Sequence, residues 1–369
     1  MNKITLLIRD SNNNKVGELD GYTEFHAIAR YNAIGNWTLD MDYTLDQAAL
    51  IDRYAGIVVM LDGSVVFSGP ITGIRRERIA MKDTVMLSGQ DDLGKIAGRL
   101  VLPDPAGPPY TAFAYDVRTG AAETIIKQYV NYNCGPLAKA SRRIAGLTIA
   151  ADSGRGGNVT GRGRFDKMVD FLTSLATIGA VGFQCRDMLF DCYVPTDRSA
   201  SISISEALGT LGDFTYEISA PDMNYSIVGG LGDLTARAFA EKGDSQSILD
   251  WGLREDFLDY NTTAVVAELL DRATDELVQR ASATKLDVAS QSLPDREPIT
   301  DYWLGDIVTG VVDGITSQVK AVEFEIILDG QGIQKVVPTF SNGNSPVGLL
   351  HNFDREARTR RAVNRLERK

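Results

Sequence analysis

Short runs of alternating apolar and polar residues, each ended by turn residues, fill the first hundred positions of this chain of 369 residues. Runs such as KITLLIRD, EFHAIARY and NWTLDMDY have the two-residue period of strands that bury one face. Between IVVML and SVVFSG stand Asp62 and Gly63, two residues that accept the positive φ of a tight hairpin turn. Because regularly spaced short strands are typical of a sandwich or small barrel, residues 1–102 are predicted to form a first β-barrel domain.

Residues 103–205 have a different composition and are predicted to form an α+β insert domain. The stretch VLPDPAGPPY places four prolines within 101–110, which predicts an extended linker or loop. TGAAETIIKQYVNYN and FDKMVDFLTSLATIG then have the apolar spacing of helices, and FQCRDMLFDCYV has the pattern of a hairpin. A two-residue turn in that hairpin would pair Cys185 with Phe190.

Strand-like runs return over residues 206–345, for example in FTYEISA, NYSIVGGLG and TSQVKAVEFEIILDG. The run TTAVVAELLDRATDELVQRAS interrupts them with a helical apolar stripe, made of Val265, Val266, Leu269, Leu270, Ala273 and Leu277. We therefore predict a second β-barrel domain with one helix. Residues 346–369 are predicted to be a basic helix or tail, because residues 353–369 hold seven Arg or Lys against three Asp or Glu. The fold class expected for the whole chain is α+β, mainly β.

Charge and residue counts narrow the classes of function. A net charge of −11 is the opposite of what a protein that neutralises phosphates needs, so no sequence-specific nucleic-acid binding is expected. An acidic surface suits a wall along which DNA or protein slides without sticking, and the alternative is that the charge simply keeps the protein soluble. No run approaches the roughly 18 apolar residues of a membrane helix, so no membrane anchor is expected. The odd number of cysteines, Cys134, Cys185 and Cys192, predicts free thiols and assembly in a cytoplasm.

The stretch DSGRGGNVTGRGRF resembles a phosphate-binding loop in one respect, because Gly156 and Gly161 have the spacing G-x-x-x-x-G. Such a loop next needs a lysine for the phosphates and a hydroxyl for Mg²⁺, and Arg162 and Gly163 occupy those two positions. A dinucleotide motif G-x-G-x-x-G fails as well, because its third glycine falls on Val159. We interpret the stretch as a flexible glycine loop that leads into a helix, without a nucleotide.

No residue is assigned to catalysis, to a cofactor or to a metal. His26 alternates with apolar residues in EFHAIARY and is interpreted as the polar face of a strand, and His351 lies beside the charged tail. DMDYTLD begins like an EF-hand loop, but Thr44 and Leu45 stand where an oxygen ligand and the glycine belong. A catalytic pair of carboxylates stays open, because the fold sets the distances among 49 acidic residues. Arginines remain as candidate docking residues for an acidic partner: Arg155, Arg162 and Arg164.

Four stretches carry a resemblance to a known family. They are FHAIARYNAIGNWTLDMD, VVFSGPITGIRRER with DTVMLSGQDDLGKIAGRLVLP, WGLREDFLDYN and DYWLGDIVTG. In order and spacing over roughly residues 20–340, the chain resembles the baseplate-hub and tail-tip proteins of tailed bacteriophages and related contractile injection systems. None of the four stretches is catalytic.

The resemblance implies a structural virion protein and no enzyme. Proteins of this kind have two tube-like β-barrel domains with α/β inserts and form a homotrimer, a hub ring of pseudo-sixfold symmetry. The ring adapts a hexameric tail tube to a trimeric spike or tip and lines the delivery channel. The implied partners are further copies of the chain, the tail tube or distal tail protein, the spike or tip protein and the tape-measure protein, in a virion tail or baseplate assembled in the host cytoplasm.

Within that picture the basic tail is a further docking candidate. Arg358, Arg360 and Arg361 would meet an acidic surface of a neighbouring subunit, and the alternative is a solvated, frayed helix. Two other functions stay open. A cell-wall-degrading hydrolase of the tail tip would need a pair of carboxylates in a cleft, and a receptor-binding adhesin would use exposed aromatic side chains.

Overall fold

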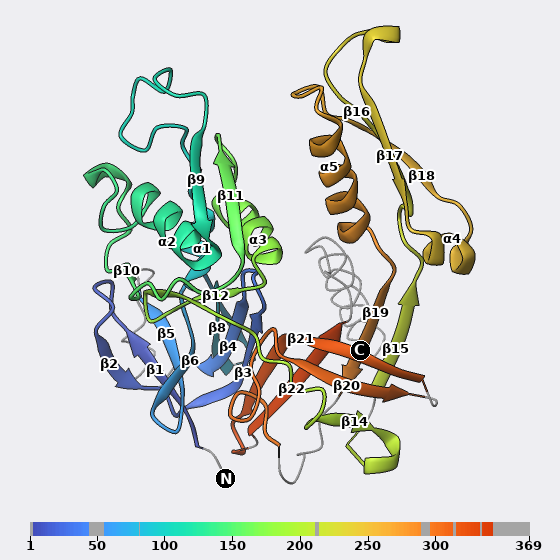
Figure 1. Ribbon diagram of the computed structural model, residues 1–369. Coiled ribbons are helices and arrows are strands. Elements are labelled where there is room, and N and C mark those ends of the chain that lie inside the picture. Colours follow the sequence, from blue (N-terminus) through green and yellow to red (C-terminus); the bar gives the residue numbers. More distant parts are fainter. Residues whose placement is uncertain are drawn as a thin grey trace. The chain divides into compact units, whose positions relative to one another are not determined.

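The computed structural model describes residues 3–43, 55–80, 82–210, 214–288, 296–312, 315–332 and 334–341. The chain divides into two compact units, and the described residues of unit 1 are residue 288 and those within 3–210, 296–309 and 320–339. Those of unit 2 lie within 214–287, 310–319 and 340–341. Strands outnumber helices in each unit (Figure 1), so the prediction of a mainly β chain is confirmed.

The first sheet of unit 1 has four antiparallel strands in the order β2-β1-β5-β6. These are β1 (Ile4–Arg9), β2 (Lys15–Glu18), β5 (Gly56–Leu61) and β6 (Ser64–Pro70). The predicted hairpin at Asp62 and Gly63 is confirmed, because Leu61 pairs with Ser64 and φ is 47° and 83° at the two turn residues. A turn with two positive φ angles matches the twist of the strands that it joins.

A second sheet, most of which belongs to unit 1, includes the strand order β22-β21-β3-β4-β8-β7. Their bounds are β3 (Tyr22–Arg30), β4 (Asn36–Asp42), β7 (Gly73–Ile79), β8 (Lys82–Gln90), β21 (Ile315–Asp329) and β22 (Gln334–Ser341). Two short strands, β14 (Ser203–Ser205) and β20 (Ile307–Val312), pair with each other, and β20 also pairs with β21. No sheet is closed on itself among the described residues, so the two-barrel architecture remains a proposal.

His26 lies on the less buried face of β3, as its alternation with buried Phe25 and Ala27 predicted. Its Nε2 lies 2.8 Å from Oε1 of Glu24, and its Nδ1 lies 3.3 Å from Oε1 of Glu325 on β21. The hydrogen bond to Glu325, assisted by Glu24, raises the pKa of His26 to about 8 although burial opposes the shift. The imidazolium therefore links two strands, and its role is structural.

The insert region of unit 1 contains helices and short strands packed together. They are α1 (Leu93–Ala97), β9 (Asp116–Ala121), α2 (Ala122–Asn133), β10 (Thr148–Ile149), β11 (Asn158–Gly163), α3 (Met168–Ile178), β12 (Gly182–Arg186) and β13 (Leu189–Tyr193). The two predicted helices are confirmed as α2 and α3. The hairpin is confirmed as β12–β13, in which Cys185 pairs with Phe190 around a turn of positive φ at Asp187 and Met188.

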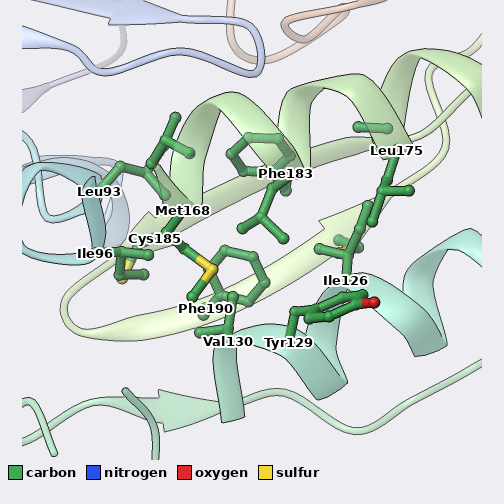
Figure 2. Close-up of a cluster of buried hydrophobic side chains, with 14 of the residues drawn as sticks. Leu93, Ile96, Ile126, Tyr129, Val130, Met168, Leu175, Phe183, Cys185 and Phe190 are labelled. Atoms are coloured by element: carbon green, nitrogen blue, oxygen red, sulfur yellow. The ribbon is translucent and has the colours of Figure 1, made fainter. Parts of the chain in front are cut away.

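One hydrophobic cluster holds these elements together. Figure 2 shows side chains of α1, α2, α3 and the β12–β13 hairpin converging, among them Leu93, Ile96, Ile126, Tyr129, Val130, Met168, Leu175, Phe183, Cys185 and Phe190. All three cysteines are free and buried, as predicted, and burial raises the pKa of Cys134 and Cys192 to about 12. They therefore act as small apolar residues and not as reactive thiols.

The carboxylate of Asp92, fully buried just before α1, joins several distant segments of unit 1. Arg9 of β1, itself 1% exposed, forms a bidentate ion pair with it, and Nη1 of Arg9 lies 3.0 Å from Oδ2. Ser68 of β6 donates its hydroxyl to Oδ2 at 2.7 Å, and the backbone N–H of Met188 donates at 3.2 Å. The first sheet, α1 and the β12–β13 turn are thus tied to one buried charge.

Asp306 plays a similar part in the stretch DYWLGDIVTG. Its side chain, 5% exposed, accepts a hydrogen bond from the backbone N–H of Thr196 at 2.7 Å and from Nε of Arg198 at 2.8 Å. The N–H of Trp303 also donates to it, at 3.1 Å. This acidic residue therefore fixes the chain between β13 and β14 against the start of β20, which gives the Leu-Gly-Asp turn a structural reason.

Unit 2 contains a three-stranded sheet in the order β17-β16-β18, with α5 packed on it. Its elements are β15 (Phe214–Ser219), β16 (Tyr225–Gly229), β17 (Phe239–Gly243), α4 (Ser245–Trp251), β18 (Glu255–Asp259), α5 (Val266–Gln279) and β19 (Ala283–Val288), with β15 beside β19. The cluster of buried apolar side chains under α5 is small, and consists of Val228, Ala240, Leu269 and Ala273.

One expectation about packing needs correction. The helix α5 is confirmed, but its predicted stripe is buried only in part: Leu269 and Ala273 are buried, whereas Val265 and Val266 are about half exposed. The reason is that a sheet of three strands covers only a narrow ridge of the helix.

The proline-rich stretch, residues 101–110, contains neither helix nor strand, so the predicted loop is confirmed. Its first two residues, 101 and 102, are buried in unit 1.

We expect Asp92→Ala to lower the free energy of unfolding by about 3–5 kcal/mol, because it leaves the guanidinium of Arg9 buried without its main counter-charge. Urea denaturation followed by circular dichroism measures this. The control is Arg76→Ala, which breaks the exposed pair of Arg76 with Asp83 and should change stability little. Equal losses in the two variants would contradict the central role of Asp92.

Candidate interaction surface on the insert

The glycine-rich stretch is not a flexible loop throughout, which corrects the sequence interpretation. Its second half forms β11, which pairs antiparallel with β9. Asn158 lies opposite Ala121 at one end of the pairing, and Gly163 lies opposite Asp116 at the other. Side chains of β11 alternate between the helices and solvent: Val159, Gly161 and Gly163 are buried, and the residues between them are exposed. A two-residue period was present in the sequence, but two of the three buried positions, Gly161 and Gly163, lack the apolar side chains that would have revealed it.

Close packing, and not phosphate binding, explains the glycines of β11. A Cβ atom at Gly161 would lie 2.7 Å from the ring of Tyr129, and one at Gly163 would overlap Val101. Tyr129 is fully buried on α2, and its hydroxyl donates to the backbone oxygen of Asp116 at 2.7 Å. The absence of side chains at Gly161 and Gly163, two of the three inner positions of β11, therefore lets the β9–β11 ribbon lie directly against α2.

Arg155, the first docking candidate, is engaged within unit 1. Its Nε and Nη2 each lie 2.8 Å from the carboxylate of Glu123, and its backbone N–H donates to the same group at 2.8 Å. Glu123 is fully buried in the first turn of α2, where it also binds Lys127 at 2.6 Å. The hydrogen bond from Arg155 is the largest cause that holds the pKa of Glu123 well below its ordinary value. Asp191 of β13, 3.3 Å from Arg155, completes the cluster.

Arg162 and Arg164, the other two candidates, are exposed and lie over an aromatic side chain. The guanidinium carbons lie 5.2 Å and 5.8 Å from the centre of the Tyr115 ring. Beyond them, the ring of Phe165 contacts that of Tyr110 edge-on, with centroids 5.7 Å apart. Register places Val117, 54% exposed, directly opposite Arg162. We call this set the Arg–aromatic patch: Tyr110, Tyr115, Val117, Arg162, Arg164 and Phe165.

The charge of the patch is not neutralised by the carboxylates around it. Asp116 is bound to Arg118, 3.0 Å away, and Asp166 accepts from the backbone N–H of Arg164 at 2.7 Å. The side chain of Arg164 donates to the backbone oxygen of Ala114. Within the described residues, no carboxylate forms an ion pair with either exposed arginine. These residues lie at or near the end of the β9–β11 ribbon where Gly163 pairs with Asp116, and Figure 1 shows this end beside the loop that precedes β9.

Such a surface suits the recognition of another protein. Arginines stacked on exposed rings offer charge, donors and apolar area together, which is the chemistry enriched at protein interfaces. In the described part of the chain, no three side chains of His, Cys, Asp or Glu are grouped so that they could hold a metal ion. Among the same residues, no helix is long and apolar enough to cross a membrane.

The sequence led to the arginines but not to their surroundings. Tyr110, Tyr115 and Phe165 were missed, because nothing in the loop sequence shows that they gather around the end of β11. The register of β9 with β11 brings them together, and no spacing rule gives a register between strands 40 residues apart. The other docking candidates, Arg358, Arg360 and Arg361, lie outside the described residues.

Comparison with known protein families shows to which family the chain belongs. Residues 5–341 match the model of the family described as Siphovirus ReqiPepy6 Gp37-like protein. The chain belongs to this family. Because the match spans most of the sequence, the resemblance to phage tail and baseplate proteins is confirmed. No curated protein matches the sequence.

Solved structures of phage tail proteins share the fold of this Gp37-like protein. The 43 kDa tail protein of prophage MuSo2 from Shewanella oneidensis is similar with a TM-score of 0.63 at 12% identity, over 91% of this chain and 98% of that one. The prophage tail protein gp18 from Listeria monocytogenes gives 0.59 at 12% identity, over 94% and 97%. The tail protein from Neisseria meningitidis gives 0.59 at 13% identity, over 92% and 96%. At these identities the likeness shows the fold.

We expect Gly161→Ala to lower the free energy of unfolding by about 1–3 kcal/mol, because the new methyl group meets the rigid ring of Tyr129. Gly157→Ala is the matched control: its Cβ would have only ordinary contacts, at 3.8 Å or more, so stability should stay near that of the parent. Thermal unfolding of both variants tests this. A neutral Gly161→Ala would mean that the ribbon does not lie against α2.

We expect Arg155→Ala to lower the free energy of unfolding by about 1–3 kcal/mol, because buried Glu123 loses both hydrogen bonds from the guanidinium and retains only Lys127 and the backbone N–H of residue 155. The combined Arg162→Ala and Arg164→Ala variant removes exposed side chains from the same stretch, so folding should stay intact. Denaturant unfolding compares the two. If the double variant lost as much stability as Arg155→Ala, the distinction between a structural and a surface arginine would be wrong.

Proposed function

We propose that this Gp37-like protein is a structural component of a phage tail, a baseplate hub or tail-tip protein that forms a homotrimeric ring. The ring would adapt a hexameric tail tube to a trimeric spike or tip and line the delivery channel. The observation that supports this most is the family match over residues 5–341, joined to a fold shared with prophage tail proteins over more than nine-tenths of both chains.

The architecture of the proposed ring has two tube-like β-barrels, at 1–102 and 206–345, with an α+β insert at 103–205 and a basic tail at 346–369. The partners are further copies of the chain, the tail tube or distal tail protein, the spike or tip protein and the tape-measure protein. An acidic chain of net charge −11 suits a channel, because like charges keep DNA from sticking to its wall. The role is not enzymatic, and the chain acts in the virion tail after assembly in the host cytoplasm.

By sedimentation equilibrium, the purified chain alone is expected to have the mass of a trimer, three times 40.1 kDa. If it trimerises only with a partner, the complex with a tail tube or spike protein should contain three copies of the chain. With the tube protein it should form a complex that electron microscopy shows as a ring at the end of the tube. A variant with alanine at Arg358, Arg360 and Arg361 should weaken this complex, because these residues are proposed to dock on a neighbouring subunit.

A chain that stays a monomer and binds neither a tube nor a spike protein would overturn the proposed function. Peptidoglycan release measured in parallel addresses the hydrolase alternative. Activity above that of buffer, lost on substitution of a carboxylate pair, would replace the structural role with an enzymatic one.

A further inference from the structure

The sheet of unit 2 has one covered face and one open face. Val228 pairs with Ala240, and both are buried against α5. Side chains alternate along a strand, so the next residues of each strand face away from the helix. There Phe239 and Phe257 are 52% and 49% exposed. We call this set the open sheet face: Tyr225, Ile227, Phe239, Glu241, Glu255 and Phe257, which register places opposite one another across β17, β16 and β18.

Two carboxylates of the open sheet face, those of Glu241 and Glu255, form no ion pair among the described residues of unit 2. Its described ion pairs join Arg237 to Asp259, Arg280 to Asp256 and Glu276, and Arg272 to Glu276, and none of them includes Glu241 or Glu255. The surrounding sequence is acidic as well. Residues 225–280 hold eleven Asp or Glu against five Lys or Arg, a net charge of −6.

The face and the Arg–aromatic patch are complementary in chemistry. The patch offers two guanidinium groups without carboxylate partners among the described residues, next to exposed tyrosine and phenylalanine rings. The face offers two carboxylates, Glu241 and Glu255, that form no ion pair among the described residues. The guanidinium of Arg237 already lies over the rings of Phe239 and Phe257, 5.8 Å and 5.5 Å from their centres. The complementarity therefore lies in the charges, because the guanidinium groups of the patch would supply the cations that Glu241 and Glu255 lack.

We propose that the Arg–aromatic patch of one copy of this chain binds the open sheet face of unit 2 of a second copy. The proposal rests on the homo-oligomer of the proposed function and names the surfaces that would form it. Because the two surfaces differ, the contact is head-to-tail, and each copy gives a patch to one neighbour and a face to the other. Head-to-tail contacts close into a ring when the rotation between copies permits it, and three identical contacts would close a trimer.

Charge reversal tests the pairing. Arg162→Glu with Arg164→Glu reverses the patch, and Glu241→Lys with Glu255→Lys reverses the face. Each pair of substitutions is expected to raise the dissociation constant of the oligomer about tenfold or more, and the chain with all four is expected to recover association. The matched control is Arg75→Glu with Arg78→Glu, which reverses two exposed charges on β7 and should leave association unchanged. Sedimentation equilibrium gives the constants, and circular dichroism checks folding.

Cross-linking separates contact between copies from contact within one chain. The native cysteines are buried, so a cysteine introduced at Val117 or Glu255 is the exposed thiol of its variant. A short thiol-reactive cross-linker should give dimers when the Val117→Cys chain is mixed with the Glu255→Cys chain. Neither variant alone should give them, because a head-to-tail contact brings unlike surfaces together.

The outcomes separate this inference from the proposed function. The pairing is overturned if both charge-reversed variants keep the dissociation constant of the parent oligomer, or if the chain with all four substitutions does not recover association. Either result leaves the proposed homotrimer standing. Normal oligomers that no longer bind the tail tube protein would assign the patch to that protein and overturn the pairing as well. A parent chain that is monomeric with every tail partner overturns the pairing and the homotrimer together.

Discussion

The buried ion pair between Asp92 and Arg9 is the interaction on which the arrangement of unit 1 depends. Both side chains are at most 1% exposed, so the cost of removing them from water must be offset by partners held in one geometry. Those partners come from β1, from Ser68 of β6 and from the turn at Met188. The β12–β13 hairpin can donate its Met188 N–H to Asp92 only if the hairpin lies against the first sheet, where Arg9 and Ser68 hold the carboxylate. The insert core, and with it the β9–β11 ribbon that carries the Arg–aromatic patch, is positioned by this requirement.

Local patterns made a large part of this fold predictable. The turn at Asp62 and Gly63 and the pairing of Cys185 with Phe190 depend on residues close in sequence, where backbone preference and the two-residue period act together. Helices α2 and α3 were predicted for the same reason, because their apolar spacing is set within a few turns. In α5 the spacing gave the helix but not its burial, since the width of the sheet beneath it is a tertiary property.

The candidate site was less predictable, because it depends on register and on missing side chains. Glycines drew attention to the stretch as a phosphate loop, yet Gly161 and Gly163 are there so that a strand can lie against Tyr129 and Val101. Arg155 and Arg162 looked equivalent in the sequence. Arg155 binds a buried carboxylate of α2, whereas Arg162 projects from the outer face of β11. The two arginines differ because β11 begins at Asn158: Arg155 precedes the strand, whereas Arg162 lies within it on the exposed face.

In unit 2, exposed apolar side chains and net charge have opposite effects on association between copies of the chain. Its buried cluster is small, while Leu234 and Leu249 are 91% and 79% exposed and two phenylalanines lie on the open sheet face. Exposed apolar area of this kind favours association without regard to partner. A net charge of −11 opposes this, because copies of the chain repel one another at long range. In the contact that we propose between copies, Arg162 and Arg164, which form no ion pair among the described residues, supply beside Tyr115 a local cation that offsets this repulsion. Repulsion would then suppress random contacts and leave the contact in which these arginines meet the acidic open sheet face.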